Sequence, residues 1–341
     1  MKPKPLNKGD KIAFIAPSSG LSALFTHRLD NATKYLENEG YQVVLFPTVS
    51  KIIDGKAGNV QDRVKDLEDA FTDKSIKAII CAIGGLSCNE LINEIDYKKI
   101  KNNPKIFCGY SDITILHYAI QKKTNLTTFY GPAAMTQFGE YPKTLEYTEK
   151  HFEKAVTEQI GEIKASDLWT DELLDWSEKK DLERPRELKP NKGYIWLKKG
   201  EAKGKIIGGC LSSIMQLSGT EFNISYKDKI LFIETPEGQD FTKGEPLNYV
   251  DSQLMDLRNL GVFDQIKGLI VGKPFGYTNE EQKEFENLIK EHTNKYDFPV
   301  LINVNIGHTD PIITIPLMVE CKLDSKNNEF SIIESGVELF K

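Results

Sequence analysis

Cysteine is scarce in this chain, and its five cysteines show no pairing pattern. Their number is odd and no two stand in a C-x-x-C spacing, which argues against a disulfide framework and against a zinc site. They are Cys81, Cys88, Cys108, Cys210 and Cys321. We therefore expect reduced thiols and no bound metal.

Long apolar stretches and an excess of positive charge are missing as well. No run approaches the roughly 18 apolar residues that a membrane-spanning helix needs, and the opening MKPKPLNKGD lacks the apolar core and cleavage site of a secretory signal. The net charge is −6, with lysines scattered among acidic residues, so no basic face is available for nucleic acid. The sequence predicts a cytoplasmic protein that binds neither membrane nor nucleic acid.

What the chain does have is a regular alternation of short apolar runs with longer amphipathic ones. Its 341 residues, 40% of them hydrophobic, are enough for two domains. In the first part the alternation predicts an α/β domain with an open parallel sheet, flavodoxin-like or Rossmann-like. Strands are expected at residues 11–17, 41–47, 76–83, 105–109 and 127–130, with helices at 25–39 and 60–71 among the segments between them.

Periodicity fades and charge rises over residues 161–195, where we expect a linker. It would separate an N-terminal domain of residues 1–160 from a C-terminal domain of residues 196–341. The second domain is also predicted to be α/β, with a swivelling-barrel-like sheet. Its expected strands are residues 205–207, 229–233, 268–272 and 300–304 with a closing hairpin of 317–323 and 330–333, and its expected helices are 211–217, 249–260 and 280–293.

Small and polar residues follow four predicted strands of the first domain, at the ends where open parallel sheets bind ligands. These segments are residues 17–20, 84–87, 109–112 and 130–133. Gly84-Gly85 is a candidate oxyanion or phosphate cradle, because glycine lets a backbone N–H approach a ligand without a Cβ in the way. A tight turn is the alternative interpretation.

Ser111 is the candidate nucleophile. It follows a predicted strand and precedes a helix-like run of residues 113–121, as in a nucleophile elbow. The G-x-S-x-G pattern is incomplete, since Ile113 stands where the second glycine would be. A serine that merely caps the helix is the alternative that this segment leaves open.

A serine nucleophile needs a base, and His308 is the one histidine of five in a polar loop after a predicted strand. Imidazole is suited to take a serine proton near neutral pH, although a surface turn residue would look the same. Glu234 is the candidate orienting acid because it is the first polar residue after a strong apolar strand. Glu237 is an alternative that the sequence does not separate from it. The remaining histidines fall in helix-like segments: His27, His117, His151 and His292.

The order of these motifs resembles, over almost the whole chain, the LD-carboxypeptidase family of serine peptidases. This family includes the muramoyl-tetrapeptide carboxypeptidases and the microcin C self-immunity peptidases. Any one motif is weak evidence, but their shared order is specific. The motifs are GDKIAFIAPSS at 9–19, GG at 84–85 with NELI at 89–92, GYSDIT at 109–114, YGP at 130–132, GG at 208–209, LFIE at 231–234 and GHTDP at 307–311.

The resemblance implies a catalytic triad of Ser111, Glu234 and His308, with the serine on the first domain and its partners on the second. It also implies an oxyanion hole formed by the backbone amides of Gly85 and Asp112. Donors of this kind each stabilise a transition state by about 2–4 kcal/mol. A homodimer, and catalysis with neither metal nor cofactor, are further expectations from the family.

The family's substrate-binding positions match less closely. The usual Gly-Gly-Asn of the second domain ends in Cys210 here, and the loop that usually carries Ser-Asn reads Ser87-Cys88-Asn89. Tryptophans in and beside the linker resemble the microcin-immunity branch, where an aromatic packs on the nucleotide base, although simple packing between domains also explains them. These are Trp169, Trp176 and Trp196. The candidate substrate-binding residues are Gly84, Ser87, Trp169, Trp176 and Cys210.

The predicted function is therefore serine carboxypeptidase-type hydrolysis through an acyl-enzyme. The expected substrate is the LD-peptide bond of a murein tetrapeptide or a microcin C-like peptidyl-nucleotide. One alternative is a two-domain binding protein for small peptides or anionic ligands, without turnover. Another is an amidotransferase-like hydrolase with Cys108 as nucleophile, but Cys108 lies inside an apolar run and is expected to be buried and inert.

Overall fold

The computed structural model describes residues 1–339 and has two main sheets. The first has the strand order β14-β5-β4-β3-β1-β2, in which β1 to β5 are parallel and β14 is antiparallel to β5. This is the predicted open parallel sheet, and each expected strand is present. The bounds are β1 Lys11–Ile15, β2 Gln42–Leu45, β3 Ile76–Cys81, β4 Ile106–Gly109, β5 Phe129–Tyr130 and β14 Ile315–Pro316.

Helices connect the strands of this sheet, and their ends follow local chemistry. The side chain of Asn59 accepts a hydrogen bond from the Asp62 N–H at 2.8 Å and so caps α3. Helix α6 is not among the elements expected from the sequence, although it buries Phe152 and Val156. The helix bounds are α1 Leu21–Leu24, α2 Thr26–Asn38, α3 Val60–Thr72, α4 Tyr97–Lys101, α5 Thr114–Thr124 and α6 Glu146–Thr157.

The second sheet has the order β6-β16-β15-β10-β11-β12-β13-β9, with a parallel centre from β10 to β13. It stays open at both edges within residues 1–339, so its likeness to a swivelling barrel does not extend to closure. The strand bounds are β6 Gly161–Glu162, β9 Ile195–Lys198, β10 Glu201–Cys210, β11 Lys229–Glu234, β12 Gly268–Gly272, β13 Val300–Val304, β15 Glu320–Asp324 and β16 Glu329–Ile332. The helices are α7 Leu211–Gln216, α8 Leu247–Asn259 and α9 Asn279–Thr293.

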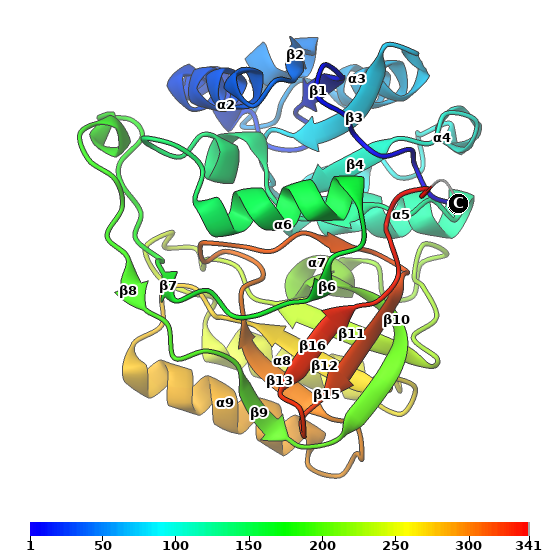
Figure 1. Ribbon diagram of the computed structural model, residues 1–341, viewed down its shortest axis with the longest axis vertical. Coiled ribbons are helices and arrows are strands. Elements are labelled where there is room, and N and C mark those ends of the chain that lie inside the picture. The colour runs from blue at the N-terminus through cyan, green and yellow to red at the C-terminus, as the bar shows by residue number, and fades with distance from the viewer. Residues whose placement is uncertain (340–341) are drawn as a thin grey trace.

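The two sheets lie one above the other along the long axis of the molecule (Figure 1). A segment with the small pair β7 (Leu168–Trp169) and β8 (Lys189–Pro190) runs down one side between them. Strand β14, late in the chain, returns to the first sheet and pairs with β5. Buried apolar residues of both sheets form one continuous core, and the division at residues 160 and 195 stays a prediction.

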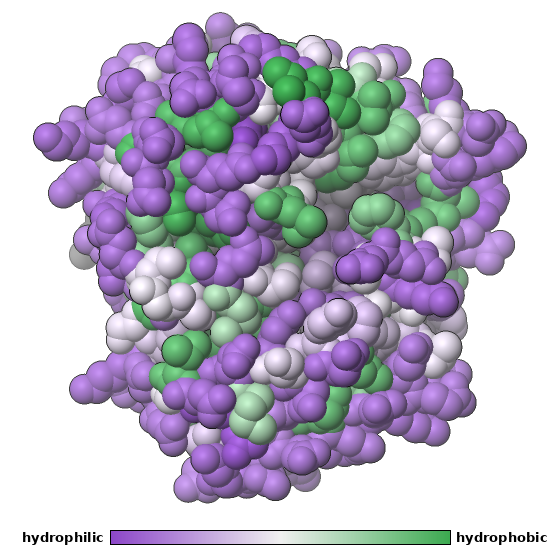
Figure 2. All heavy atoms as spheres, turned by 180° about the vertical axis from the view of Figure 1, so that it is seen from behind, coloured by the Kyte–Doolittle hydropathy of each residue, from purple (hydrophilic) through white to green (hydrophobic). Residues whose placement is uncertain are grey.

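The surface on the face opposite that of Figure 1 is mostly hydrophilic (Figure 2). Hydrophobic side chains form separate patches there, the larger ones over the half built around the first sheet. Within residues 1–339 no helix combines the length and the apolar character that crossing a membrane requires.

Candidate active site

Ser111 lies in the turn between β4 and α5, where a short 3-10 turn spans Ser111–Ile113. Its φ is 63°, in the left-handed region that costs a non-glycine residue on the order of 1–3 kcal/mol. A strained turn from strand to helix is the setting that exposes a nucleophilic serine. The Ser111 side chain caps neither the 3-10 turn nor α5, so the capping alternative is not what the structure shows.

His308 lies between Ser111 and Glu234. Its Nε2 is 3.0 Å from Ser111 Oγ, and its Nδ1 is 2.7 Å from Glu234 Oε2. Glu234 ends β11, and His308 lies in the loop after β13. The two side chains are 0% and 4% exposed. The nucleophile, base and orienting carboxylate of a serine hydrolase occupy positions of this kind.

The second carboxylate, Glu237, faces the other ring nitrogen. Its Oε2 is 3.6 Å from His308 Nε2, so it lies beside the nitrogen that would receive the serine proton. Burial lowers the pKa of His308, but Glu234 and Glu237 outweigh burial and raise this pKa to about 9. A general base must be neutral, and the two carboxylates together favour the charged ring instead.

Two tyrosines that the sequence did not single out complete the surroundings of the triad. The Tyr130 hydroxyl donates to Glu234 Oε1 and accepts from the Ser111 N–H at 3.1 Å. The Tyr110 ring packs edge-on against His308, with ring centroids 5.1 Å apart. Their place in the sequence was a signal, since Tyr130 ends a strand in the YGP motif and Tyr110 directly precedes Ser111.

The Gly84–Gly85 turn lies directly against Ser111. A Cβ on Gly84 would lie 3.0 Å from Ser111 Oγ and 3.4 Å from the backbone N of Asp112. Gly85 has a φ of 149°, and a Cβ there would collide with the Ser18 hydroxyl. Both positions therefore need glycine, and the Gly84 backbone lies close beside the Ser111 side chain.

The Asp112 side chain joins the loops that follow β1, β3 and β4. Its Oδ2 accepts hydrogen bonds from Ser18 Oγ at 2.5 Å and from the N–H groups of Ser87 and Cys88 at 2.9 Å each. The Ser87 hydroxyl accepts from Arg63 at 2.9 Å. Ser87, a predicted substrate contact, is thus buried and bonded within the protein.

Cys210 ends β10 directly beside Glu234 in the parallel ladder. Its N–H donates to Thr114 Oγ1 at 3.0 Å, and the Thr114 hydroxyl donates to the Ser111 carbonyl at 2.6 Å. The second sheet therefore contacts the turn at Ser111 through the backbone of Cys210, and the thiol of Cys210 is buried.

The three tryptophans lie in three different environments. Trp169 packs under Lys273, whose Nζ is 4.2 Å from the ring centroid. The guanidinium of Arg28 lies 4.7 Å from the ring centroid of Trp176. The indole N–H of Trp196 donates to the turn between β15 and β16 at 2.8 Å. None of these three contacts involves Ser111, Glu234 or His308.

The other candidate groups are buried. Cys108 is fully buried in β4, its thiol donates to the Pro132 carbonyl at 3.5 Å, and burial raises its pKa. His117 is fully buried in α5, where burial lowers its pKa to about 4. Within the part of the chain that the structure describes, no cluster of three or more His, Cys, Asp or Glu side chains could hold a metal ion.

A strained serine at a strand end, in contact with a histidine that a buried glutamate orients, defines a serine-type hydrolase on an α/β scaffold. The chain belongs to the LD-carboxypeptidase family, and is thereby a serine-type carboxypeptidase. The LD-carboxypeptidase N-terminal domain matches residues 12–131, and the LD-carboxypeptidase C-terminal domain matches residues 203–323.

Curated relatives match over nearly the full length. The putative carboxypeptidase YocD of Bacillus subtilis is 33% identical over 94% of this chain and 95% of its own. The microcin C7 self-immunity protein MccF of Escherichia coli is 31% identical over 97% of this chain and 95% of its own. A probable murein peptide carboxypeptidase of Bacillus subtilis is 31% identical over 98% and 95%.

Solved structures of microcin C7 self immunity protein MccF share the fold. The wild-type apo structure superposes with a TM-score of 0.91 at 29% identity, covering 99% of this chain and 100% of that one. The complex of MccF with aspartyl sulfamoyl adenosine superposes with a TM-score of 0.90 at 30% identity, with the same coverage.

Proposed function

We propose that the protein hydrolyses an amide bond near the free carboxyl terminus of a small peptide, or the corresponding bond of a peptidyl-nucleotide, through an acyl-enzyme on Ser111. The observation that carries this proposal is the His308 ring, which contacts Ser111 Oγ through Nε2 and Glu234 through Nδ1. A neutral ring held in this way can take the serine proton.

The steps follow from these contacts. His308 Nε2 takes the Ser111 proton as Oγ bonds to the carbonyl carbon, and the amides of Gly85 and Asp112 are proposed to donate to the oxyanion. His308 then gives the proton to the leaving nitrogen, the C–N bond breaks, and the acyl group stays on Ser111 as an ester. Water, deprotonated by His308, attacks the ester carbon, the bond from this carbon to Ser111 Oγ breaks and the acid is released, while His308 returns the proton to Oγ.

Two substrate classes are open to this site, and overall similarity does not choose between them. The murein peptide carboxypeptidase and the self-immunity protein are each 31% identical to this chain. The MccF complex with aspartyl sulfamoyl adenosine supports the nucleotide class, with Trp169 or Trp176 as the proposed aromatic contact. Gly84, Ser87 and Cys210 are kept as further proposed contacts.

Incubation with an LD-tetrapeptide and with an amide-linked peptidyl-nucleotide, followed by mass spectrometry of the products, tests the function and ranks the substrates. Ser111→Ala and His308→Ala should each abolish product formation without unfolding the protein. Ser177→Ala, at an exposed turn, is the matched control and should keep full turnover. Either active-site variant with wild-type turnover would overturn the proposal. Tight binding of both ligands by the wild type without any product would favour the binding protein.

The family resemblance also leads us to propose a homodimer in the cytoplasm. Sedimentation of the full chain should give a mass of twice 38.6 kDa, and cell fractionation should recover it with cytoplasmic markers. A species of 38.6 kDa at micromolar concentration would contradict the dimer.

A further inference from the structure

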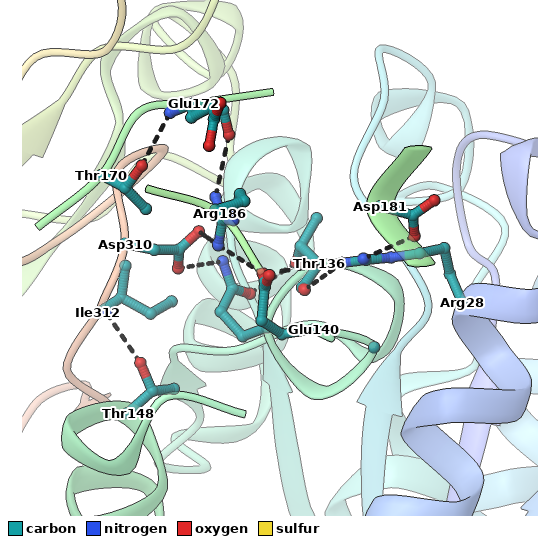
Figure 3. Close-up of polar contacts among 12 residues, drawn as sticks. Arg28, Thr136, Glu140, Thr148, Thr170, Glu172, Asp181, Arg186, Asp310 and Ile312 are labelled. Atoms are coloured by element: carbon teal, nitrogen blue, oxygen red, sulfur yellow. Dashed lines mark hydrogen bonds and ion pairs between the residues drawn. The ribbon is translucent and has the colours of Figure 1, made fainter. Parts of the chain in front are cut away.

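Arg186, in the segment between β7 and β8, lies between two buried carboxylates from distant parts of the chain (Figure 3). Its Nη2 donates to Glu140 Oε2 at 2.6 Å and to Asp310 Oδ2 at 2.8 Å. The side chains of the three are 15%, 7% and 9% exposed. Removing charges from water is costly, so this cluster is stable only because each charge has a partner.

Asp310 is held from three directions. Besides Arg186, Gln137 Nε2 donates to Asp310 Oδ1 at 3.0 Å. The backbone of Asp310 pairs with Thr170, whose N–H donates to the Asp310 carbonyl at 2.6 Å and whose carbonyl accepts from the Asp310 N–H at 2.9 Å. Thr170 and Arg186 belong to the same connecting segment, and Gln137 follows β5. Asp310 is therefore an anchor point between this segment and the part of the chain around the first sheet.

This anchor lies two residues after His308. The residue before His308 must be glycine, because Gly307 has a φ of 98° and a Cβ there would lie 2.5 Å from Glu234 Oε2. The backbone after His308 is held at Asp310. The position of the His308 ring relative to Ser111 thus depends on contacts made by Asp310.

Negative charge surrounds His308. Three of the nearby carboxylates are Glu234, Glu237 and Asp310. Among the described residues, Arg186 is the one cationic side chain, apart from His308 itself, that forms an ion pair with any of these three. Asp310 is one of the charges that raise the pKa of His308, and Arg186 is the cation that pairs with Asp310. The carboxylates near His308 come from three places: Glu234 and Glu237 at or just after the end of β11, Glu245 in the loop before α8, and Asp310 in the loop that carries His308. The other titratable groups that face His308 or Glu234 are Tyr110, Tyr130 and Cys210.

We propose that Arg186 is a positioning residue of the active site: it holds Asp310 against Glu140, and so keeps His308 in line with Ser111 while neutralising a carboxylate beside the ring. This inference rests on the proposed role of His308 as the base. It gives the connecting segment a part in catalysis that does not require contact with substrate.

Arg186→Met tests the proposal, with Arg184→Met as the matched control. Arg184 lies in the same segment but is 45% exposed and pairs with Glu172. Arg186→Met should lower kcat about 10- to 100-fold with KM nearly unchanged, as misplacement of a catalytic group does. It should also move the acid limb of the kcat/KM profile up by about half a pH unit, because Asp310 is no longer neutralised. Arg186→Lys should return the acid limb of the kcat/KM profile to its wild-type pH and restore part of kcat. Arg184→Met should behave as wild type.

A reciprocal variant keeps the test decisive if Arg186→Met folds poorly. Asp310→Asn removes the carboxylate, so it should move the acid limb down, and Arg186→Met/Asp310→Asn should return it toward the wild-type value. A lower Tm with kcat and acid limb unchanged in Arg186→Met would overturn the inference and leave a merely structural ion pair.

The proposed function and this inference fail in different ways. A wild-type protein that hydrolyses neither substrate contradicts the function, whereas an active wild type matched by Arg186→Met contradicts the inference. Titration of the His308 imidazole by NMR measures the same pKa shift without turnover. An unshifted imidazole pKa in Arg186→Met would count against Arg186 even in an inactive enzyme.

Discussion

The hydroxyl of Tyr130 donates a hydrogen bond to Glu234 and accepts one from the backbone N–H of Ser111. Tyr130 ends β5 of the first sheet and Glu234 ends β11 of the second, and neither is more than 1% exposed. One phenol therefore connects the turn at Ser111 to the carboxylate that bonds to His308, in parallel with the histidine itself.

Tyr130→Phe should lower kcat by about tenfold and the free energy of unfolding by about 1–3 kcal/mol, because it leaves a buried carboxylate oxygen and a backbone N–H without their partner. Urea unfolding and steady-state kinetics measure the two effects. Tyr226→Phe is the control, since Tyr226 is also buried but its hydroxyl makes only a 3.5 Å contact with Tyr118. A Tyr130→Phe enzyme with wild-type kcat would show that this bridge has no catalytic part.

Gly307→Ala should disable the enzyme through the position of Glu234. The new Cβ would lie 2.5 Å from Glu234 Oε2, the oxygen bonded to His308. Gly9→Ala is the control for backbone strain alone, because Gly9 has a φ of 92° and no atom within 4 Å of its Cβ position. We expect Gly9→Ala to cost about 1–2 kcal/mol of stability with kcat unchanged, and Gly307→Ala to cost more and to lose most of kcat. Equal stability and equal activity of the two variants would contradict this.

Local patterns in the sequence predicted the elements that carry the site. The strands predicted at residues 268–272 and 300–304 have the same bounds in the structure, because strands in the parallel centre of a sheet are buried and therefore rich in apolar residues. Asn303 is the one polar residue within these two ranges. The rule that ligands bind at strand ends indicated Ser111, and the structure places His308 in hydrogen-bond contact with Ser111 through one ring nitrogen and with Glu234 through the other.

What the sequence did not predict depends on contacts between distant residues. Arg186 and Asp310 are 124 residues apart, and Tyr130 and Glu234 are 104 apart. No periodicity within a short window reports such a pair. The return of β14 to the first sheet is of the same kind, since a two-residue strand has no pattern of its own. Trp169 and Trp176 were singled out by residue type, and their packing under Lys273 and Arg28 follows from tertiary contacts alone.

Glu237→Gln should extend activity to lower pH. Glu237 raises the pKa of His308, so removing its charge should lower that pKa and populate the neutral base at lower pH. The acid limb of kcat/KM measures this shift. Asp240→Asn, an exposed acid of the same loop that bonds to Thr242, should leave the limb in place.

Glu234→Gln distinguishes the role of Glu234 from that of Glu237. It replaces the charged acceptor of the Nδ1–H by a neutral amide and should lower kcat at every pH, because the ring loses the carboxylate that fixes its tautomer and orientation. If Glu237→Gln lost as much kcat as Glu234→Gln, Glu237 would be the orienting acid instead.

Stability and activity should change in opposite directions with pH. The pKa of His308 is raised from 6.5 to about 9 in the folded protein, so the folded state binds this proton more tightly than the unfolded state. The resulting stability is fully present below pH 6.5 and is lost as the pH rises through 9. Over the same interval the neutral base forms, and kcat/KM should rise.

Urea unfolding of the wild type and of Glu234→Gln/His308→Asn across this interval measures the effect. The double variant removes both charges of the pair, and subtracting its free energy of unfolding cancels other groups that titrate there, such as Lys105 and Lys273, whose pKa burial lowers to about 8. The difference between the free energies of unfolding of the wild type and the double variant should shrink by on the order of 3 kcal/mol as the pH rises. A difference that stays constant would mean that His308 is neutral throughout, and the carboxylates around it would then be compensated by charges other than the ring.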